Sequence, residues 1–358
     1  MNILITIPDF LPQEDSILIV SLGLASLTFI PKLKSKHWAV RGFEFIKLQL
    51  TALQGLLFIY ICVNDFTLSW KELISVLALA CALYFNLKRI FDFTFMVPKE
   101  VNSSRNSIYT YSILTINIHK DNPFKKNFLN RLNEINPDIL LLLEADDKWC
   151  SALHELKNQY PYMLVKPQHD RHGIALYSKH PIEDGFINHI VNTDIPSIDC
   201  YLNIRGRRVH FYGIHPELPS PTQPMSVKDR DAEVLRLASR LRDKKETSMV
   251  SGNFNIPIWS KTSFLFTKES GLVDPRIGRG FYPTLSALSP KVLRLPVDQL
   301  FHTKDIECTD LETVAVKGAQ HLGLMYTFTL SNSAASTKNS KQLTKQEKKF
   351  VEESKHQV

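Results

Sequence analysis

The chain has 358 residues, with 44% hydrophobic and 22% charged residues and a net charge of +7. This length allows one domain of ordinary size with an appendage, or two small domains. The charge suits an anionic partner, either a phosphate-bearing substrate or an acidic membrane surface, but lysines in loops and in the tail explain it equally well. The five cysteines are odd in number and scattered, which argues against a disulfide framework and a cysteine-rich zinc site and fits a reducing compartment.

Three apolar runs dominate the first part of the chain, at residues 16–30, 49–63 and 72–87. Each is a little shorter than the roughly 20 residues that cross a bilayer, but flanking phenylalanines extend the runs toward the interface. Buried helices of a soluble domain are the alternative, although three such runs within residues 1–98 favour membrane spans. We therefore predict an anchor of three transmembrane helices over residues 1–98.

The basic residues predict how this anchor is oriented. The segment between the first two runs is basic, with Lys32, Lys34, Lys36 and Arg41. Residues 64–71, between the second and third runs, are nearly neutral, and the third run is followed by Lys88 and Arg89. Because cytoplasmic loops are enriched in lysine and arginine, we expect the N-terminus outside and everything after residue 88 in the cytoplasm. Acidic residues near the start of the chain argue against a cleaved signal peptide.

From residue 107 onward, short β-branched runs alternate with helical stretches. We predict helices over 122–135, opened by Asn122-Pro123, and over 226–243. Predicted strands lie at 111–118, 139–143, 173–178, 198–204, 208–214, 247–252 and 297–302. This alternation indicates a layered α/β or α+β domain over residues 99–330. The segment 331–358 is rich in Ser, Lys, Glu and Gln, so we predict a disordered polar tail.

Polar residues stand at the ends of several predicted strands. Asn117 lies on the first strand and Glu144 follows the second, and one crossover helix between them would bring both side chains to the same sheet edge. Glu144 directly follows five aliphatic residues, where a charge is costly unless it is paired or bound to a metal. Further along come His215, Gly252-Asn253-Phe254-Asn255, Asp298 and Gln320-His321. Carboxylates, amides and histidines are the groups that metal-dependent phosphoester hydrolysis requires.

The order of these motifs resembles the endonuclease/exonuclease/phosphatase family. Its signature runs Asn, Glu, a strand-end His, Gly-Asp-x-Asn, a late Asp and Ser-Asp-His, and the resemblance covers about residues 110–330. Gly173-Ile174-Ala175-Leu176-Tyr177-Ser178 with Pro181-Ile182 is similar to another strand of the family. A bacterial branch with three N-terminal membrane helices is similar in further segments, at residues 38–43, 215–219, 255–260 and 278–284.

This resemblance implies a four-layer α/β/β/α sandwich, a phosphoester hydrolase activity and Mg²⁺ or Mn²⁺ as cofactor. It makes Glu144 the main metal ligand, with Asn117 holding the metal or a phosphate oxygen, and it places Gln320 where the family has a further metal ligand. It also implies a multi-pass protein of the bacterial inner membrane, with the hydrolase domain in the cytoplasm.

The remaining roles that the resemblance implies concern the phosphate. Asn255 and His215 would contact the scissile phosphate. His321 would stabilise the pentacovalent transition state, and Asp298 would orient and charge His321. Asn253 stands where the family has the residue that orients or deprotonates the attacking water.

Two positions depart from the family signature, because Asn253 and Gln320 replace aspartates. An amide accepts a hydrogen bond from water but cannot take its proton, and losing general-base assistance costs about 10²–10⁴ in rate. Fewer carboxylates also weaken the binding of hard cations. Two hypotheses follow: a working hydrolase, which the retained His321 and Asp298 favour, or an inactive family member that binds a phosphorylated ligand or a protein partner at the membrane.

The sequence leaves the substrate and the oligomeric state open. Phospholipid headgroups, nucleic acids and inositol phosphates are all handled by this fold. No aromatic and basic stripe marks a nucleic-acid track, and Arg205, Arg207 and Arg208 are typical of a solvated edge. The lipid bilayer is the partner that the apolar runs imply. A transporter is disfavoured because the interiors of these runs hold no Asp, Glu, Lys, Arg or His that would mark a pathway.

Overall fold

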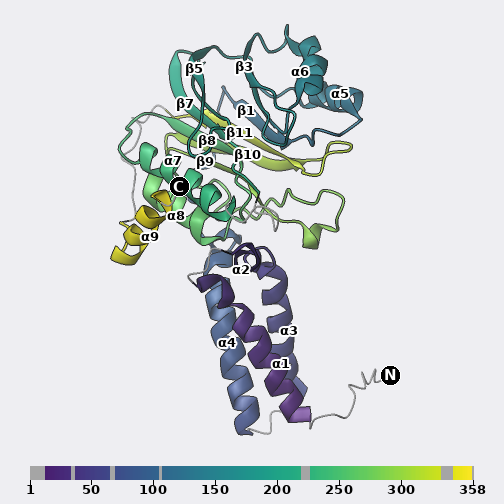
Figure 1. Cartoon of the computed structure of the whole chain (residues 1–358), viewed down its shortest axis with the longest axis vertical. Coiled ribbons are helices and arrows are strands. Elements are labelled where there is room, and N and C mark those ends of the chain that lie inside the picture. The colour runs from purple at the N-terminus through teal and green to yellow at the C-terminus, as the bar shows by residue number, and fades with distance from the viewer. Residues whose placement is uncertain are drawn as a thin grey trace. The chain divides into compact units, whose positions relative to one another are not determined.

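A computed structural model describes residues 13–33, 37–64, 69–104, 107–218, 226–331 and 342–356 of the chain. It divides into two compact units, Met1–Phe91 and Asp92–Val358. The whole chain is drawn in Figure 1. Each unit is described in turn.

The first unit is helical. Its helices are α1 (Gln13–Leu27), η1 (Ile30–Lys32), α2 (Trp38–Gly42), α3 (Lys47–Asn64) and α4 (Trp70–Ile90), followed by η2 (Phe91–Phe93). Figure 1 shows α1, α3 and α4 side by side. Three segments are long and apolar enough to cross a membrane, Gln13–Lys32, Lys47–Asn64 and Trp70–Phe93. The prediction of three N-terminal hydrophobic helices is thus confirmed.

Buried polar side chains join these three helices. Gln54 on α3 donates from Nε2 to Leu24 O at 2.7 Å and to Thr28 Oγ1 at 2.9 Å. Asn86 on α4 donates from Nδ2 to the same Thr28 oxygen at 3.0 Å and to Gln54 Oε1 at 3.1 Å. Interhelical hydrogen bonds of this kind stabilise helix packing where water is excluded.

The second unit contains two β-sheets. The first sheet has the order β10-β11-β1-β2-β4-β3 and the second has the order β5-β6-β7-β8-β9. The strands of the first sheet are β1 (Tyr111–Asn117), β2 (Ile139–Leu143), β3 (Tyr162–Lys166), β4 (Ile174–Ser178), β10 (Ile306–Val314) and β11 (Gly323–Leu330). Those of the second are β5 (Ile182–Asn188), β6 (Ser197–Ile204), β7 (Arg207–Ile214), β8 (Ser248–Asn253) and β9 (Asp298–His302).

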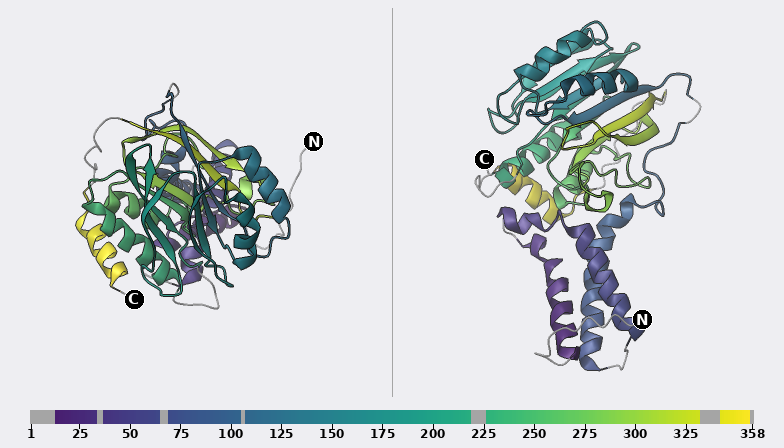
Figure 2. Two further views of the ribbon diagram at one scale, coloured as in Figure 1. Left: turned by 90° about the horizontal axis from the view of Figure 1, so that it is seen from above. Right: turned by 90° about the vertical axis from the view of Figure 1, so that its right-hand side faces the viewer.

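Helices cover the outer face of each sheet, as Figure 2 shows. The helices of this unit are α5 (Lys125–Ile135), α6 (Asp147–Ala152), η3 (Leu153–Leu156), α7 (Ser226–Arg242), α8 (Lys261–Ser270), η4 (Lys291–Leu293) and α9 (Lys345–Lys355). The core packing assigns α5 and α6 to the first sheet, through Phe128 and Trp149. It assigns α7 and α8 to the second sheet, through Leu237 and Phe266. The mixed α/β fold with two sheets that the sequence predicts is confirmed.

Strand β2 is apolar at every position because both of its faces are buried. Ile139, Leu141 and Leu143 pack between the two sheets, while Leu140 and Leu142 pack under the outer helices. Strands buried on both faces read as continuous apolar runs, because successive side chains point in opposite directions. A hydrogen bond of 2.6 Å between Thr115 Oγ1 on β1 and Ser251 Oγ on β8 also joins the two sheets.

The predicted first helix begins later than expected. Asn122 and Pro123 were expected to open it, but α5 starts at Lys125. Asn122 instead forms a turn, in which its Oδ1 accepts from Phe124 N at 2.9 Å while its Nδ2 donates to Lys317 O at 3.0 Å. The hydrogen bond to a residue distant in sequence explains why local sequence misplaces the helix start.

The C-terminal tail is ordered where the sequence predicts disorder. Residues 345–355 form α9, and Thr344 caps the helix by accepting from Glu347 N at 3.3 Å. Val351 is buried against Leu235 and Leu265. Partly buried Leu343 and Phe350 pack in the same cluster, so a few apolar residues dock this polar helix. The remaining residues of the predicted disordered tail lie partly outside the described ranges.

Candidate active site

Two strand ends of the first sheet hold an amide and a carboxylate together. Strands β1 and β2 run parallel, with Asn117 opposite Leu143, so Glu144 leaves β2 beside Asn117. Asn117 Nδ2 donates to Glu144 Oε1 at 2.9 Å, and both residues are buried. The geometry brings this predicted pair together.

Backbone strain marks the same edge. Glu144, His119 and Asn255 have positive φ angles of 63°, 58° and 52°, in the left-handed region that side-chain-bearing residues seldom adopt. His119 N donates locally to Asn117 Oδ1 at 3.1 Å, and Ala145 N donates to the distant Gly173 O at 3.1 Å, so hydrogen bonds hold both turns. Such strain concentrates at functional sites, where it aims side chains that regular strands would point elsewhere.

A buried histidine–aspartate pair forms the second part of the site. His321 Nδ1 and Asp298 Oδ2 are 2.7 Å apart, and Asp298 is fully buried at the start of β9. Burial alone would favour neutral His321, but the charge of Asp298, its hydrogen bond and the charge of Glu144 outweigh this and raise the pKa of His321. The contact with Asp298 therefore favours the charged form of the imidazole.

His215 lies at the end of β7 in the same region. Its complete burial lowers its pKa to about 4, against the opposing influence of the Glu144 charge, so this imidazole is neutral at pH 7. The His215 and His172 rings are 6.4 Å apart between centroids. The charges of Glu144, His321 and Asp298 all act on His215, which places these four predicted residues around one centre.

The two asparagines of the β8 motif hold each other and the neighbouring loop. Asn253 Oδ1 accepts from Asn255 N at 2.9 Å, and Asn255 Nδ2 donates to Pro216 O at 2.7 Å. Buried Arg230 donates to Asn255 O at 3.1 Å. Gly252 precedes this turn because a Cβ there would collide with Ile214 O. One amide hydrogen of Asn255 remains for a ligand, since an NH₂ group has two.

Gln320 differs from the other predicted site residues in its exposure. It is exposed, and its main-chain oxygen accepts from Ala287 N at 2.8 Å. Among the described residues, no contact joins its side chain to the Asn117–Glu144 pair. Seven of the predicted site residues are buried at this end of the sheets, whereas Gln320 lies at the surface.

The sequence model of the Endonuclease/Exonuclease/phosphatase family matches residues 114–322, a range that includes all the residues of this site. The chain belongs to this family. Comparison with curated proteins gives no match.

Solved structures share the fold of this Endonuclease/Exonuclease/phosphatase domain. TDP2 of D. rerio complexed with a single-strand DNA product superimposes with a TM-score of 0.52 at 13% identity, covering 62% of this chain and 99% of that one. An endonuclease/exonuclease/phosphatase from Beutenbergia cavernae has a TM-score of 0.50 at 17% identity, covering 62% of this chain and 72% of that one. At this level of identity the likeness concerns the fold alone.

Metals are common in the Endonuclease/Exonuclease/phosphatase family, so the donors of this chain need a test. Within the described ranges, no group of three or more His, Cys, Asp or Glu residues is arranged to hold a metal ion. Glu144 nevertheless has a further neighbour, because His119 Nδ1 lies 3.6 Å from Glu144 Oε2 and lacks a hydrogen-bond partner although it is buried. A carboxylate, an amide and an imidazole fit a divalent cation in kind, with a single negative charge.

His119 was not among the predicted site residues. The available signal was its position two residues beyond Asn117, where the chain leaves β1. The left-handed turn at His119, which brings its ring beside Glu144, is visible only in the folded chain.

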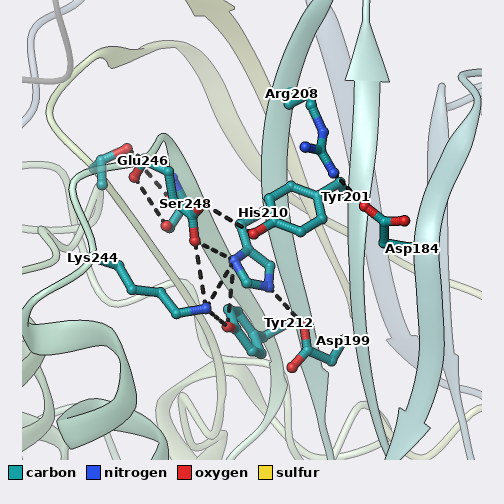
Figure 3. A network of polar contacts seen from close by, with 10 residues as sticks. Asp184, Asp199, Tyr201, Arg208, His210, Tyr212, Lys244, Glu246 and Ser248 are labelled. Atoms are coloured by element: carbon teal, nitrogen blue, oxygen red, sulfur yellow. Dashed lines mark hydrogen bonds and ion pairs between the residues drawn. The ribbon is translucent and has the colours of Figure 1, made fainter.

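A second polar cluster, drawn in Figure 3, surrounds His210 on the second sheet. His210 Nε2 lies 2.6 Å from Asp199 Oδ1, and its Nδ1 lies 2.5 Å from Glu246 Oε1. The ring stacks between Tyr201 and Tyr212, with centroids 4.2 and 4.3 Å away. Each ring nitrogen of His210 therefore lies within hydrogen-bonding distance of a carboxylate. The sequence shows no motif here, and the cluster ties the segment before β8 to β6 and β7.

Proposed function

We propose that this chain is a membrane-anchored, divalent-metal-dependent phosphoester hydrolase. The observation that carries the proposal is the buried His321–Asp298 pair at 2.7 Å, which lies in the same site as the Asn117–Glu144 pair. The His321–Asp298 pair supplies a cationic imidazole, and the Asn117–Glu144 pair supplies a carboxylate and an amide. Together they are the groups that phosphoryl transfer needs around a reacting phosphate.

Each residue has a role in this proposal. Glu144 and Asn117 would hold the metal, with His119 as an added donor, and the metal would supply Lewis-acid polarisation of a phosphoryl oxygen. Charged His321 donates to the oxygen that gains negative charge, while Asp298 fixes its tautomer and orientation. His215 and the remaining amide hydrogen of Asn255 bind the other phosphate oxygens.

Asn253 limits the rate in this mechanism. Its Oδ1 accepts the Asn255 backbone N–H at 2.9 Å, and an amide cannot take a proton from water. The attacking water is therefore oriented but not deprotonated by this residue. We expect slow turnover at neutral pH that rises as hydroxide becomes more available, as long as His321 keeps its proton.

The anchoring part of the proposal is supported by the three candidate membrane spans. Lysines and arginines flank the ends that we assign to the cytoplasmic side, and this distribution supports the proposal that the hydrolase domain lies in the cytoplasm of a bacterial cell. The bilayer is then a constant partner, and a phosphoester carried on a membrane lipid is always at hand. Nucleic acid and inositol phosphates remain the competing substrate classes.

A second function has its own support. Asn253 and exposed Gln320 both lack the carboxylate of the family signature, which suits a protein that binds a phosphorylated ligand or a partner without hydrolysing it. In that case, the same buried site would bind phosphate through His321 and Asn255.

Activity of the full chain in detergent distinguishes the two functions. The substrate is bis(p-nitrophenyl) phosphate, with Mg²⁺ or Mn²⁺, and Glu144→Ala is compared with Glu312→Ala, an exposed residue on β10. Metal-dependent turnover that Glu144→Ala abolishes and Glu312→Ala retains supports the hydrolase.

The double substitution Asn253→Asp with Gln320→Asp completes this test. A silent wild type that becomes active in the double variant means that the scaffold is intact and the natural protein is a binder. Silence of both proteins, with every substrate class supplied, counts against the hydrolase.

A further inference from the structure

We propose that the segment 284–295, called the 284–295 hairpin, is a lipid-contacting element that delivers membrane-borne phosphoesters to His321. This deepens the proposed function and rests on it, because it names phospholipids as the substrate class. Three observations carry it: the attachment of the hairpin to the catalytic pair, the apolar tip, and the charge beside that tip.

The base of the hairpin is attached to the catalytic pair. Leu285 and Leu295 bridge each other, with N–O distances of 2.9 and 3.2 Å in the two directions. Leu285 also forms a bridge with His321, and Leu322 N donates to Thr284 O at 2.9 Å. The base of the hairpin is therefore next to the histidine that we propose to contact the phosphate.

The tip of the hairpin is apolar and exposed. Leu288 is 92% exposed, Val292 71% and Leu293 50%, within a stretch of six residues. Hydrogen bonds hold this shape, since Arg294 Nε donates to Ser289 O at 2.9 Å and Leu293 N donates to Pro290 O at 2.9 Å. The exposure thus belongs to an ordered turn, and a cluster of exposed aliphatic side chains marks a contact surface.

The chemistry around the tip selects a lipid surface. Lys291 is exposed between the apolar residues, so its ammonium group can reach lipid phosphates while its neighbours enter the acyl region. A nucleic acid or an inositol phosphate offers no apolar surface to three aliphatic side chains. The three candidate spans of the same chain also bring it to a bilayer. A phospholipid presents both acyl chains for the apolar tip of the hairpin and a phosphoester for the site at His321.

Fluorescence quenching tests the contact without relying on activity. The full chain is placed in nanodiscs of phosphatidylcholine and phosphatidylglycerol, with Leu288→Trp compared with Tyr162→Trp on β3 and with the wild type as background. We expect brominated acyl chains to quench the added tryptophan at 288 and to leave the one at 162 unchanged. An unquenched tryptophan at 288, or equal quenching at both positions, overturns the proposal.

Hydrolysis by the full chain tests delivery of the substrate. For Leu288→Asp with Val292→Asp, we expect about a tenfold or larger loss on phosphatidylglycerol in nanodiscs and less than about a twofold change on the soluble phosphodiester. Equal loss on both substrates means that the hairpin only supports the fold, and no loss on either removes its role. If the wild type hydrolyses neither substrate, the proposed function fails while the quenching result still decides the lipid contact.

Discussion

The positive charge of the site depends on one contact, between Asp298 and His321. Without that carboxylate, burial would keep the imidazole neutral. A raised pKa also links this pair to stability. The contribution of His321 is fully present below its unfolded pKa near 6.5 and is lost as pH rises through the higher folded value.

Asp298→Asn tests this contact, because it keeps the size of the side chain and removes its charge. We expect the pKa of His321 to fall and turnover to drop by about 10²-fold or more. Titration of the His321 ring protons by NMR and steady-state rates are the measurements. The double variant Asp298→Asn with His321→Ala should lose little more turnover than Asp298→Asn alone, because the two residues act as a unit. Additive losses of turnover would contradict this role.

The buried carboxyl of Glu233 on α7 lowers the stability of the folded protein at neutral and alkaline pH. Its burial, together with the charges of Asp229 and Glu217, raises its pKa to about 8, so the folded protein keeps this carboxyl protonated at pH 7. The unfolded chain releases the proton above its pKa of 4.5, and stability therefore falls as pH rises from 4.5 to 8. Glu233→Gln should raise the free energy of unfolding at pH 8 by about 1–3 kcal/mol and change it little at pH 4.5. Thermal unfolding of the variant at both pH values, beside Glu312→Gln as the exposed control, measures the effect.

At the scale of elements, the three long helices are joined by the Gln54, Thr28 and Asn86 contacts. Each amide is buried, so removing one member leaves another without its full set of partners. Gln54→Leu should destabilise the helical unit by about 0.6–2 kcal/mol in unfolding by denaturing detergent. The double variant Gln54→Leu with Asn86→Leu should cost less than the sum of the single variants. Strict additivity would show that these contacts are independent.

Helix α9 is attached to α7 and α8 by few contacts. Val351 supplies the apolar contact, Lys268 Nζ pairs with Glu347 Oε2 at 2.7 Å, and Arg236 Nε donates to Lys355 O at 3.0 Å. Val351→Asp would bury an unpaired charge, so we expect α9 to detach and become sensitive to proteases while β8 keeps its hydrogen-exchange protection. The exposed substitution Glu353→Asp serves as the control. Loss of protection throughout the domain would contradict independent detachment.

At the scale of the whole molecule, two histidines set opposite limits on pH. His215 must be neutral and its pKa is about 4, whereas His321 must be charged and its pKa lies above 6.5. We expect kcat/KM to fall on the acid side near pH 4 and on the alkaline side as His321 loses its proton. The pH profile of Asp298→Asn should have its alkaline limb at lower pH, and an unmoved limb would assign that limb to another group.

Two buried, neutral imidazoles make the domain less stable as the pH falls below about 6.5. Burial lowers the pKa of His215 and of His302 to about 4, whereas the unfolded chain binds these protons below about pH 6.5. Between these values the unfolded state binds more protons, so the domain loses stability as pH falls from 6.5 to 4. His302 also bonds Thr303 O and the Tyr326 hydroxyl, which its charged form would have to accommodate.

The sequence by itself determined the order of elements and much of the site. Apolar runs predicted the three helices and β2, because burial on both faces leaves a continuous aliphatic pattern. The order of Asn117, Glu144, His215 and His321 along the chain, together with the motifs around them, indicated the family. Strands β3, β5, β10 and β11 were not predicted. The first three are partly exposed and therefore give weaker patterns, whereas β11 is mostly buried.

Only the tertiary structure decided which side chains meet. His119 reaches Glu144 through a left-handed turn, and Gln320 has an exposed side chain. The 284–295 hairpin meets His321 through bridges between distant segments. These outcomes depend on contacts between residues far apart in the chain, and local sequence carries no record of the neighbours that folding brings to a residue.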